Sequence, residues 1–168
     1  MCKWLEIGGE VVVMSGKEVE KEAAHKITIV GEVELISRDK NGRIVDRRKM
    51  KNIVVNKGKE LMAKLLNGLS NKYFKYIQIG TGTTAPSSSD TALESFYAEK
   101  EAACSYQPNF KAIFSATFTF GETVTISESG VFNDAKAASP DMLCRQTFAG
   151  KTYTSGESLE VVWTITIS

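Results

Sequence analysis

The sequence predicts a mainly β protein: an antiparallel β-sandwich of jelly-roll type, with one short α-helix and an N-terminal arm. Three observations lead to this prediction. Apolar residues recur at every second position in residues 110–120 and 161–167, as in strands with one buried face. Ser and Thr supply 26 of the 104 residues from 65 to 168, which keeps the opposite strand face wet without charge. Glycines separate the short segments, as in sandwiches of many short strands.

The segment from Phe110 to Phe120 is the clearest predicted strand. We expect its alternate apolar residues to form one face of the core: Phe110, Ala112, Phe114, Ala116, Phe118 and Phe120. The last strand repeats the pattern with Val161, Trp163, Ile165 and Ile167. Trp163 is therefore expected to lie beside the phenylalanine stripe.

A hairpin and a helix are predicted before these strands. A strand over residues 27–35 is followed by Lys40-Asn41-Gly42-Arg43, whose Asn-Gly pair is typical of tight hairpin turns, and by a return strand over 44–55. Asn56 is expected to cap a helix in which Leu61, Met62, Leu65 and Leu66 recur at helical spacing, and Gly68 to end it.

The rest of the chain predicts further short strands. Residues 73–79 are expected to form a strand, 81–89 a loop rich in Gly, Pro, Ser and Thr, and 90–101 a short helix. Strands over 124–132, 142–148 and 159–168 complete the set, which is punctuated by Gly121, Gly130, Gly150 and Gly156. No internal repeat is present.

The length of 168 residues fits one domain with a sizeable core. We divide the chain into an N-terminal arm, 1–26, and a β-sandwich domain, 27–168. The arm could reach roughly 80 Å if extended, and its apolar anchor is Val11-Val12-Val13-Met14. It is expected to clamp onto a neighbouring subunit, although residues 11–14 could instead add an edge strand to their own sandwich.

Composition excludes several classes of function. The net charge of +1 argues against a protein that wraps nucleic acid, and no apolar run approaches the length of a membrane span. The N-terminus does not resemble a secretory signal. Cys2, Cys104 and Cys144 match neither a disulfide framework nor a zinc site, so reduced thiols are expected.

The motifs that carry catalysis are also missing from the sequence. His25 is the single histidine, so neither a multi-histidine metal centre nor a Ser-His-Asp arrangement is expected. Residues 80–84, Gly-Thr-Gly-Thr-Thr, lack the Gly-Lys-Ser/Thr ending of a phosphate loop and are expected to form a turn. Glu128 has no second carboxylate placed with it by pattern, so we expect it to accept backbone hydrogen bonds. The sequence therefore predicts no catalytic, cofactor-binding or metal-ligating residue.

A basic run crosses the return strand at Arg43, Arg47, Arg48, Lys49 and Lys51. It could belong to a solvated edge strand whose cations discourage aggregation, contact an acidic partner surface, or contact nucleic acid. Candidate contacts with other subunits or with a shell are these five residues and five in the arm and its anchor: Trp4, Val11, Val12, Val13 and Met14.

Several blocks of the sequence resemble a recurrent structural protein of tailed bacteriophages. They are Lys51-Asn52-Ile53-Val54-Val55-Asn56-Lys57-Gly58, Leu61 to Leu66, Ile79-Gly80-Thr81-Gly82-Thr83-Thr84-Ala85-Pro86, Asp90-Thr91-Ala92-Leu93, Ile126 to Phe132, Met142 to Phe148 and Val161 to Thr166. The resemblance covers residues 27–168 in order and spacing. It implies a virion component of the head-decoration or tail-fibre type.

The expected function is that of a capsid decoration, or cement, protein that binds the outer shell and stabilises it. Its expected partners are the major capsid protein or other virion proteins, it is expected to form a homotrimer, and it is expected in virions assembled in the host cytoplasm. The alternative is a tail-fibre, baseplate or tail-adaptor component, which could bind a host glycan through residues 81–89 and through Tyr97, Tyr106 and Tyr153. A glycan hydrolase is disfavoured because the catalytic constellation is missing.

Overall fold

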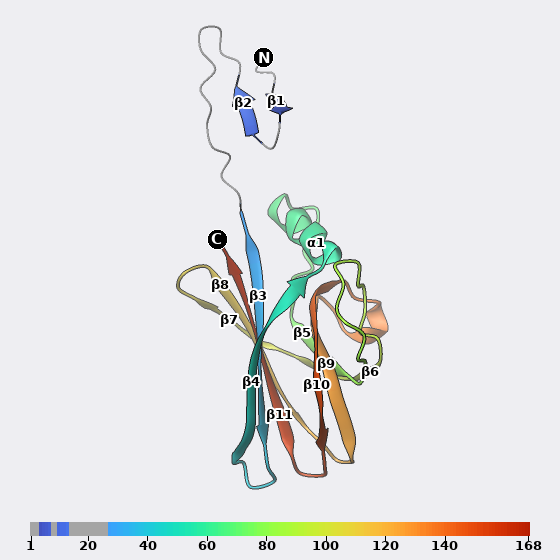
Figure 1. Ribbon diagram of the computed structural model, residues 1–168. Helices are drawn as coiled ribbons and strands as arrows, with labels where there is room; N and C mark the ends of the chain where they lie inside the picture. Colours follow the sequence, from blue (N-terminus) through green and yellow to red (C-terminus); the bar gives the residue numbers. More distant parts are fainter. Residues whose placement is uncertain (1–3, 8–9, 14–26) are drawn as a thin grey trace.

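The computed structural model describes residues 4–7, 10–13 and 27–168. The described residues form eleven strands, one α-helix and one short 3-10 helix (Figure 1). These are β1 (Trp4–Ile7), β2 (Glu10–Val13), β3 (Ile29–Arg38), β4 (Ile44–Val54), α1 (Asn56–Leu66), β5 (Tyr76–Gly80), β6 (Phe96–Glu101), β7 (Ala103–Gln107), β8 (Lys111–Thr119), β9 (Val124–Phe132), η1 (Lys136–Ala138), β10 (Met142–Tyr153) and β11 (Ser158–Ile167).

Nine strands form one antiparallel sheet in the order β6-β5-β9-β10-β4-β3-β11-β8-β7. The sheet folds over itself at β4, which pairs with β3 over residues 44–52 and with β10 only at Ile53 and Val54. Lys100 Nζ on β6 donates a 2.6 Å hydrogen bond to the Thr117 carbonyl oxygen on β8, so the sheet is nearly closed like a barrel. The mainly β, antiparallel, sandwich-like fold is confirmed.

Hairpins between consecutive strands build most of this sheet. The pairs β3-β4, β5-β6, β7-β8 and β9-β10 are all neighbours in the order, while β11 lies between β3 and β8. Four of the eight pairs of neighbouring strands thus join strands that follow one another in the chain. The jelly-roll type expected from the sequence stays a prediction.

The two sequence stripes meet in the core, as predicted. Phe114, Phe118 and Phe120 are buried, and Trp163 on β11 is paired with Phe114 on β8. The indole Nε1 of Trp163 donates to Ser129 Oγ at 3.3 Å, on the other half of the sheet. The stripe is shorter than predicted, however, because Phe110 and Ala112 are exposed at one end of the sandwich.

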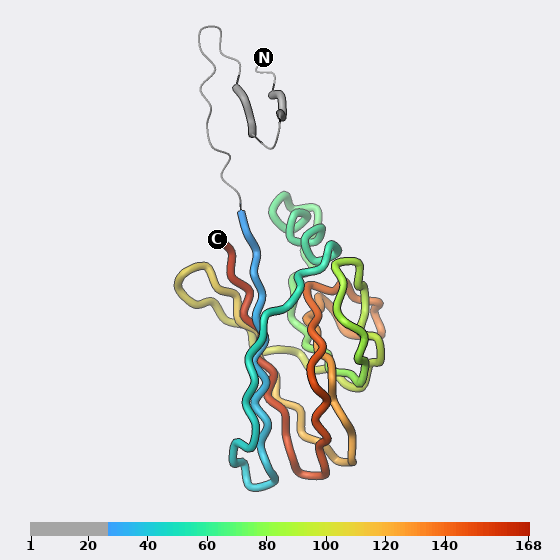
Figure 2. The backbone as a smooth tube through the Cα atoms, viewed as in Figure 1, coloured from blue at the N-terminus to red at the C-terminus, as the bar shows by residue number. Residues whose placement is uncertain are grey.

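The hairpin turn over residues 39–43 is confirmed. The Asp39 amide donates to the Arg43 carbonyl oxygen at 2.9 Å, and the Asp39 carboxylate accepts from the amides of Asn41 and Arg43. Gly42 has φ of +80°, a conformation that glycine adopts without steric cost. This turn lies at the end of the sandwich opposite to the C-terminal end of the chain (Figure 2).

The predicted helix over Asn56–Leu66 is confirmed, and Gly68 follows it with φ of +73°. The expected cap is wrong: Val55 occupies the N-cap position, and no side chain caps the helix. The Asn56 amide instead donates to the Ser88 carbonyl oxygen at 2.8 Å. A loop distant in sequence thus replaces the local cap.

The short helix predicted over residues 90–101 is also wrong. Residues 90–95 are irregular with several bends, and Phe96–Glu101 is strand β6, paired with β5. Cross-strand pairing therefore outweighs the helical propensity of this charged segment.

Candidate functional site

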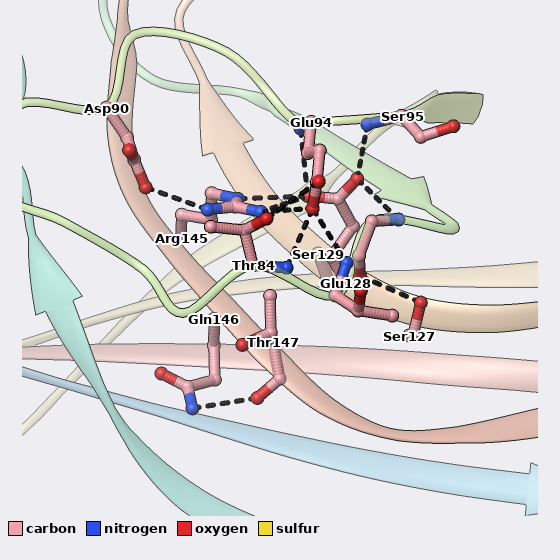
Figure 3. A network of polar contacts seen from close by, with 12 residues as sticks. Thr84, Asp90, Glu94, Ser95, Ser127, Glu128, Ser129, Arg145, Gln146 and Thr147 are labelled. Carbon is pink, nitrogen blue, oxygen red and sulfur yellow. Dashed lines mark hydrogen bonds and ion pairs between the residues drawn. The ribbon is translucent and has the colours of Figure 1, made fainter.

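A buried ion pair joins the blocks of sequence between Gly80 and Arg145. Glu128 on β9 is 0% exposed and Arg145 on β10 is 2% exposed. The Arg145 Nε atom donates to Glu128 Oε2 at 2.9 Å, and its second nitrogen, Nη2, lies 2.8 Å from the same oxygen (Figure 3). Arg145 Nη1 also pairs with Asp90 Oδ2 at 2.9 Å. We call Glu128, Arg145, Asp90 and Glu94 the Glu128 clasp.

Backbone amides from the loop occupy the remaining positions on the Glu128 carboxylate. Oε1 accepts from the amides of Gly82 at 3.0 Å and Ser95 at 2.7 Å, and Oε2 accepts from the Glu94 amide at 3.1 Å. A Cβ atom at Gly82 would lie 2.4 Å from Glu128 Oε1, so glycine is required there. The predicted role of Glu128 as an acceptor of backbone hydrogen bonds is confirmed.

A second carboxylate holds the other end of the turn. Glu94 Oε2 accepts from the amides of Thr83 at 2.7 Å and Thr84 at 2.8 Å, and Oε1 accepts from the Thr84 hydroxyl. The amides that a phosphate loop would present to a nucleotide are thus bound to the chain's own carboxylates. Residues 81–84 form an irregular loop with a bend at Thr84, and Gly80 ends β5, so the expected turn is an open loop.

The electrostatics of the clasp favour its charged form. Burial lowers the pKa of the Arg145 guanidinium, but hydrogen bonds to Asp90 and Glu128 outweigh it and raise this pKa overall. Bonds from the Thr84 amide and hydroxyl lower the pKa of the Glu94 carboxyl. A general acid must reach substrate, whereas both oxygens of Glu128 are saturated by internal donors. The arrangement is that of an anchor which holds the loop over residues 81–95 to the sheet.

The lowered pKa of Glu94 predicts that acid loosens this loop. A carboxyl whose folded pKa is depressed stabilises the fold above its unfolded pKa, about 4.3 for Glu, and that contribution is lost as the pH falls through the folded value. We expect the Thr83 and Thr84 amides to exchange faster with solvent as the pH falls below about 4, measured by amide-resolved NMR after correction for intrinsic rates. Unchanged protection of both amides in Glu94→Gln at neutral pH would contradict the assignment.

The basic run does not form one patch. Arg47, Lys49 and Lys51 lie opposite Ile36, Glu34 and Glu32 of β3, and Arg48 lies at the intervening position, on the other face of the sheet. The period of two in a strand therefore divides the run.

Most of the charges in the run are paired within the chain. Arg47 pairs with Glu34 at 2.7 Å and Lys49 with Glu32 at 2.7 Å. Arg48 pairs with Asp46 at 2.8 Å and donates to the Ala149 carbonyl oxygen on β10. β4 lies inside the strand order, between β10 and β3, so the expected edge strand is wrong for β4 as a whole. Over residues 44–52, however, β4 pairs with β3 alone, and this segment has one side without a strand partner, as an edge does. Arg43 and Lys51 are exposed.

An apolar surface lies at the end of the sandwich where residue 27 and the last strand meet. Its members are Ile27, Tyr106, Phe110 and Ile167, which are 74%, 70%, 68% and 44% exposed. Ile167 pairs with Ile29 on β3, and its amide donates to the Phe110 carbonyl oxygen at 3.1 Å. Tyr106 pairs with Ala112 on β8, which pairs with Ile165. We call these four residues the apolar end face.

The apolar end face continues the inner face of the sheet beyond the half that covers it. Trp163 and Ile165 are buried, and Ile167, two residues further along the same strand face, is exposed. Phe110 has φ of +60° and follows Asn109 at +66°. A bulky residue with positive φ is a genuine outlier that costs on the order of 1–3 kcal/mol and is found mostly at functional sites. The exposed aromatic ring is therefore held at a strained turn.

The two edges of the sheet differ in their protection. The edge strand β6, Phe-Tyr-Ala-Glu-Lys-Glu, carries three charged residues, as edge strands that resist strand addition do. The other edge strand, β7, is Ala-Cys-Ser-Tyr-Gln, and all five of its residues are exposed. It contains neither a charge nor a proline. The unprotected edge thus lies beside the apolar end face, of which its Tyr106 is a member.

The predicted arm contacts are described only in part. β1 and β2 pair with each other, with Trp4 opposite Val13, Leu5 opposite Val12 and Glu6 opposite Val11. Among the described strands, β2 pairs with β1 and not with the nine-stranded sheet. Met14 lies outside the described residues, as do the side chains of the other arm candidates.

Of the three tyrosines considered for glycan binding, one is exposed. Tyr153 is buried and hydrogen-bonded to Ser37 at 2.8 Å, and Tyr97 is partly buried and donates to Glu122. Tyr106 belongs to the apolar end face. A shallow cleft of about 310 Å³ lies on another part of the surface, with Lys57, Gln78, Thr91, Phe132, Lys136 and Asp141 among its lining residues.

The described cysteines are free thiols. Burial raises the pKa of the Cys144 thiol, and burial also raises that of Cys104, so neither is activated as a nucleophile. Within residues 4–7, 10–13 and 27–168, no group of three or more His, Cys, Asp or Glu side chains could hold a metal ion. In the same part of the chain, none of the helices has the length and apolar character needed to cross a membrane.

Sequence reasoning missed the cation of the clasp. Arg145 stands in the otherwise mostly apolar strand Met142–Phe148, and a charge in such a strand signals a buried partner. Its partners Asp90 and Glu94 lie in the segment for which a helix was expected, so the sequence did not indicate this ion pair.

Comparisons of the chain with protein-family models, curated proteins and solved structures find no match.

Proposed function

We propose that this chain is a non-enzymatic structural protein of a tailed-phage virion, a capsid decoration protein that binds the outer shell and stabilises it. The observation that carries the proposal is the apolar end face. Exposed apolar surface that is contiguous marks sites of protein association, and here it comes with a strained aromatic residue, Phe110, and an unprotected strand edge, β7.

The Glu128 clasp supports a structural role. Blocks of sequence that resemble phage structural proteins, 79–86, 90–93, 126–132 and 142–148, meet at this ion pair (Figure 3). Their charged groups bind one another or the backbone, so these residues fix a loop on the sheet and do not form a reactive centre.

The mechanism follows from mass action. A subunit that bridges neighbouring shell proteins contributes binding free energy only in the assembled particle, so the intact shell becomes more resistant to heat and internal pressure. Attachment as a trimer to the major capsid protein multiplies modest contacts through effective concentration. No deep pocket is needed for such adhesion.

Particles that lack the protein should release their genome at a lower temperature than complete particles, and adding purified protein should restore the higher temperature. The measurement is fluorescence of a nucleic-acid dye during heating. The variant Phe110→Ser should restore little. Ile44 is also an exposed apolar residue but directly follows the hairpin turn over residues 39–43, so Ile44→Ser should restore fully. Equal release temperatures with and without the protein would refute cementing.

The number of copies per particle separates the two virion candidates. Hundreds of copies, measured by quantitative mass spectrometry of purified particles, would support a place on the shell. A few copies would instead support a tail-fibre, baseplate or tail-adaptor component. If such a component binds a host glycan, Tyr106 is the exposed one of the three candidate tyrosines.

A further inference from the structure

We propose that the apolar end face and the β7 edge receive the N-terminal hairpin, β1–β2, of a neighbouring copy of the chain. The inference deepens the proposed function and rests on it for the presence of several copies side by side. It names the surface through which the copies are joined and the segment that joins them.

The receiving surface has two parts that suit a strand. The β7 edge offers backbone groups on the side away from β8 and has no charge to repel an added strand. The exposed rings of Tyr106 and Phe110 and the side chain of Ile167 lie next to it on the apolar end face. Strand addition uses both features, since backbone hydrogen bonds give affinity and side-chain contacts give specificity.

The hairpin needs a third element. β1 and β2 pair only with each other among the described strands, and an isolated two-stranded hairpin is marginally stable in water. Its sequence is apolar at Trp4, Leu5, Ile7 and residues 11–13. A surface that supplies both a strand edge and apolar cover meets this need.

The length of the connection allows the hairpin to reach another copy. Residues 14–26 comprise 13 residues and span up to about 45 Å when extended. The ten-residue strand β3 is roughly 33 Å long, so the connection exceeds the length of the sandwich. Because each copy has one hairpin and one receiving surface, the contact is heterologous and closes into a ring when the rotation between copies allows it. A ring of three copies agrees with the expected trimer.

Complementation between two defective variants tests the proposal with purified protein and without particles. Deletion of residues 1–26 removes the hairpin and leaves the whole nine-stranded sheet, whose strands lie within 29–167. Phe110→Ser keeps the hairpin and damages the receiving surface. Each variant alone should sediment as a monomer, and their mixture should form a 1:1 complex that grows no further. Wild type and Ile44→Ser should sediment as closed oligomers.

Several results would overturn the proposal. Failure of the folded variants to form a complex on mixing would exclude exchange of the hairpin between copies. A wild-type protein that stays monomeric while Trp4 is shielded from acrylamide quenching would place the hairpin on its own copy. Circular dichroism checks that both variants fold. If Phe110→Ser does not fold, Tyr106→Ser replaces it as the variant with a damaged receiving surface. If the deletion does not fold, the full-length Val12→Asp replaces it as the variant with a damaged hairpin. Particle stabilisation by a protein that fails these tests would leave the proposed function standing and refute only the hairpin contact.

Discussion

Replacing Arg145 with methionine is expected to destabilise the fold by about 3–5 kcal/mol, the cost of removing one partner of a buried ion pair. The change leaves the Glu128 carboxylate, 0% exposed, without its cation, and leaves Asp90 and Glu94 close to it as like charges. The free energy of unfolding in urea measures the effect. Lys49→Met is the matched control, since its ion pair with Glu32 is at the surface and its loss should change the free energy of unfolding little.

The double variant Arg145→Met, Glu128→Gln distinguishes a coupled pair from two separate contributions. Removing both charges leaves no uncompensated ion at the Glu128 position, so the double variant should lose less than the sum of the two single losses. Additive losses would show that Arg145 and Glu128 contribute separately, whereas a loss below about 1 kcal/mol for Arg145→Met would show that the clasp contributes little to stability.

Truncating Phe118 to alanine is expected to cost about 3–5 kcal/mol. Its ring is 4% exposed on the inner face of β8, so the change opens a cavity between the two halves of the sheet. Phe110→Ala removes the same ring from the same stripe where it is exposed, and should cost less than about 1 kcal/mol. Chemical unfolding of both variants gives the comparison. A small loss for Phe118→Ala would place this part of the stripe at the surface.

Local patterns predicted the strands and the hairpin because their signals lie within a few residues. Alternation marked β8 and β11, and the Asn-Gly pair marked the turn at Gly42. The point at which the stripe leaves the core could not be predicted, because the exposure of Phe110 depends on how far the opposite half of the sheet extends over it. Alternation shows that a face is apolar but does not show where its cover ends.

The candidate site was predicted only in part for the same reason. The structural role of Glu128 followed from the missing second carboxylate, but its partners come from residues 17 to 46 positions away. The basic run seemed continuous in sequence, whereas β pairing divides it between two faces and supplies Glu32 and Glu34 as partners. Pairing register, which a single sequence does not reveal, determines both outcomes.

The interior position of β11 affects the order in which the sheet can fold on the ribosome. β11, over Ser158–Ile167, lies between β3 and β8, so a strand synthesised after the other described strands joins the first strand of the sheet to a strand from the middle of the described chain. Until it emerges, the inner faces of β3 and β8 lack their shared neighbour, and the nascent chain exposes apolar surface throughout translation. Such long-range pairing is slow and prone to aggregation. The nine-stranded sheet can therefore be completed only after β11 has left the ribosome.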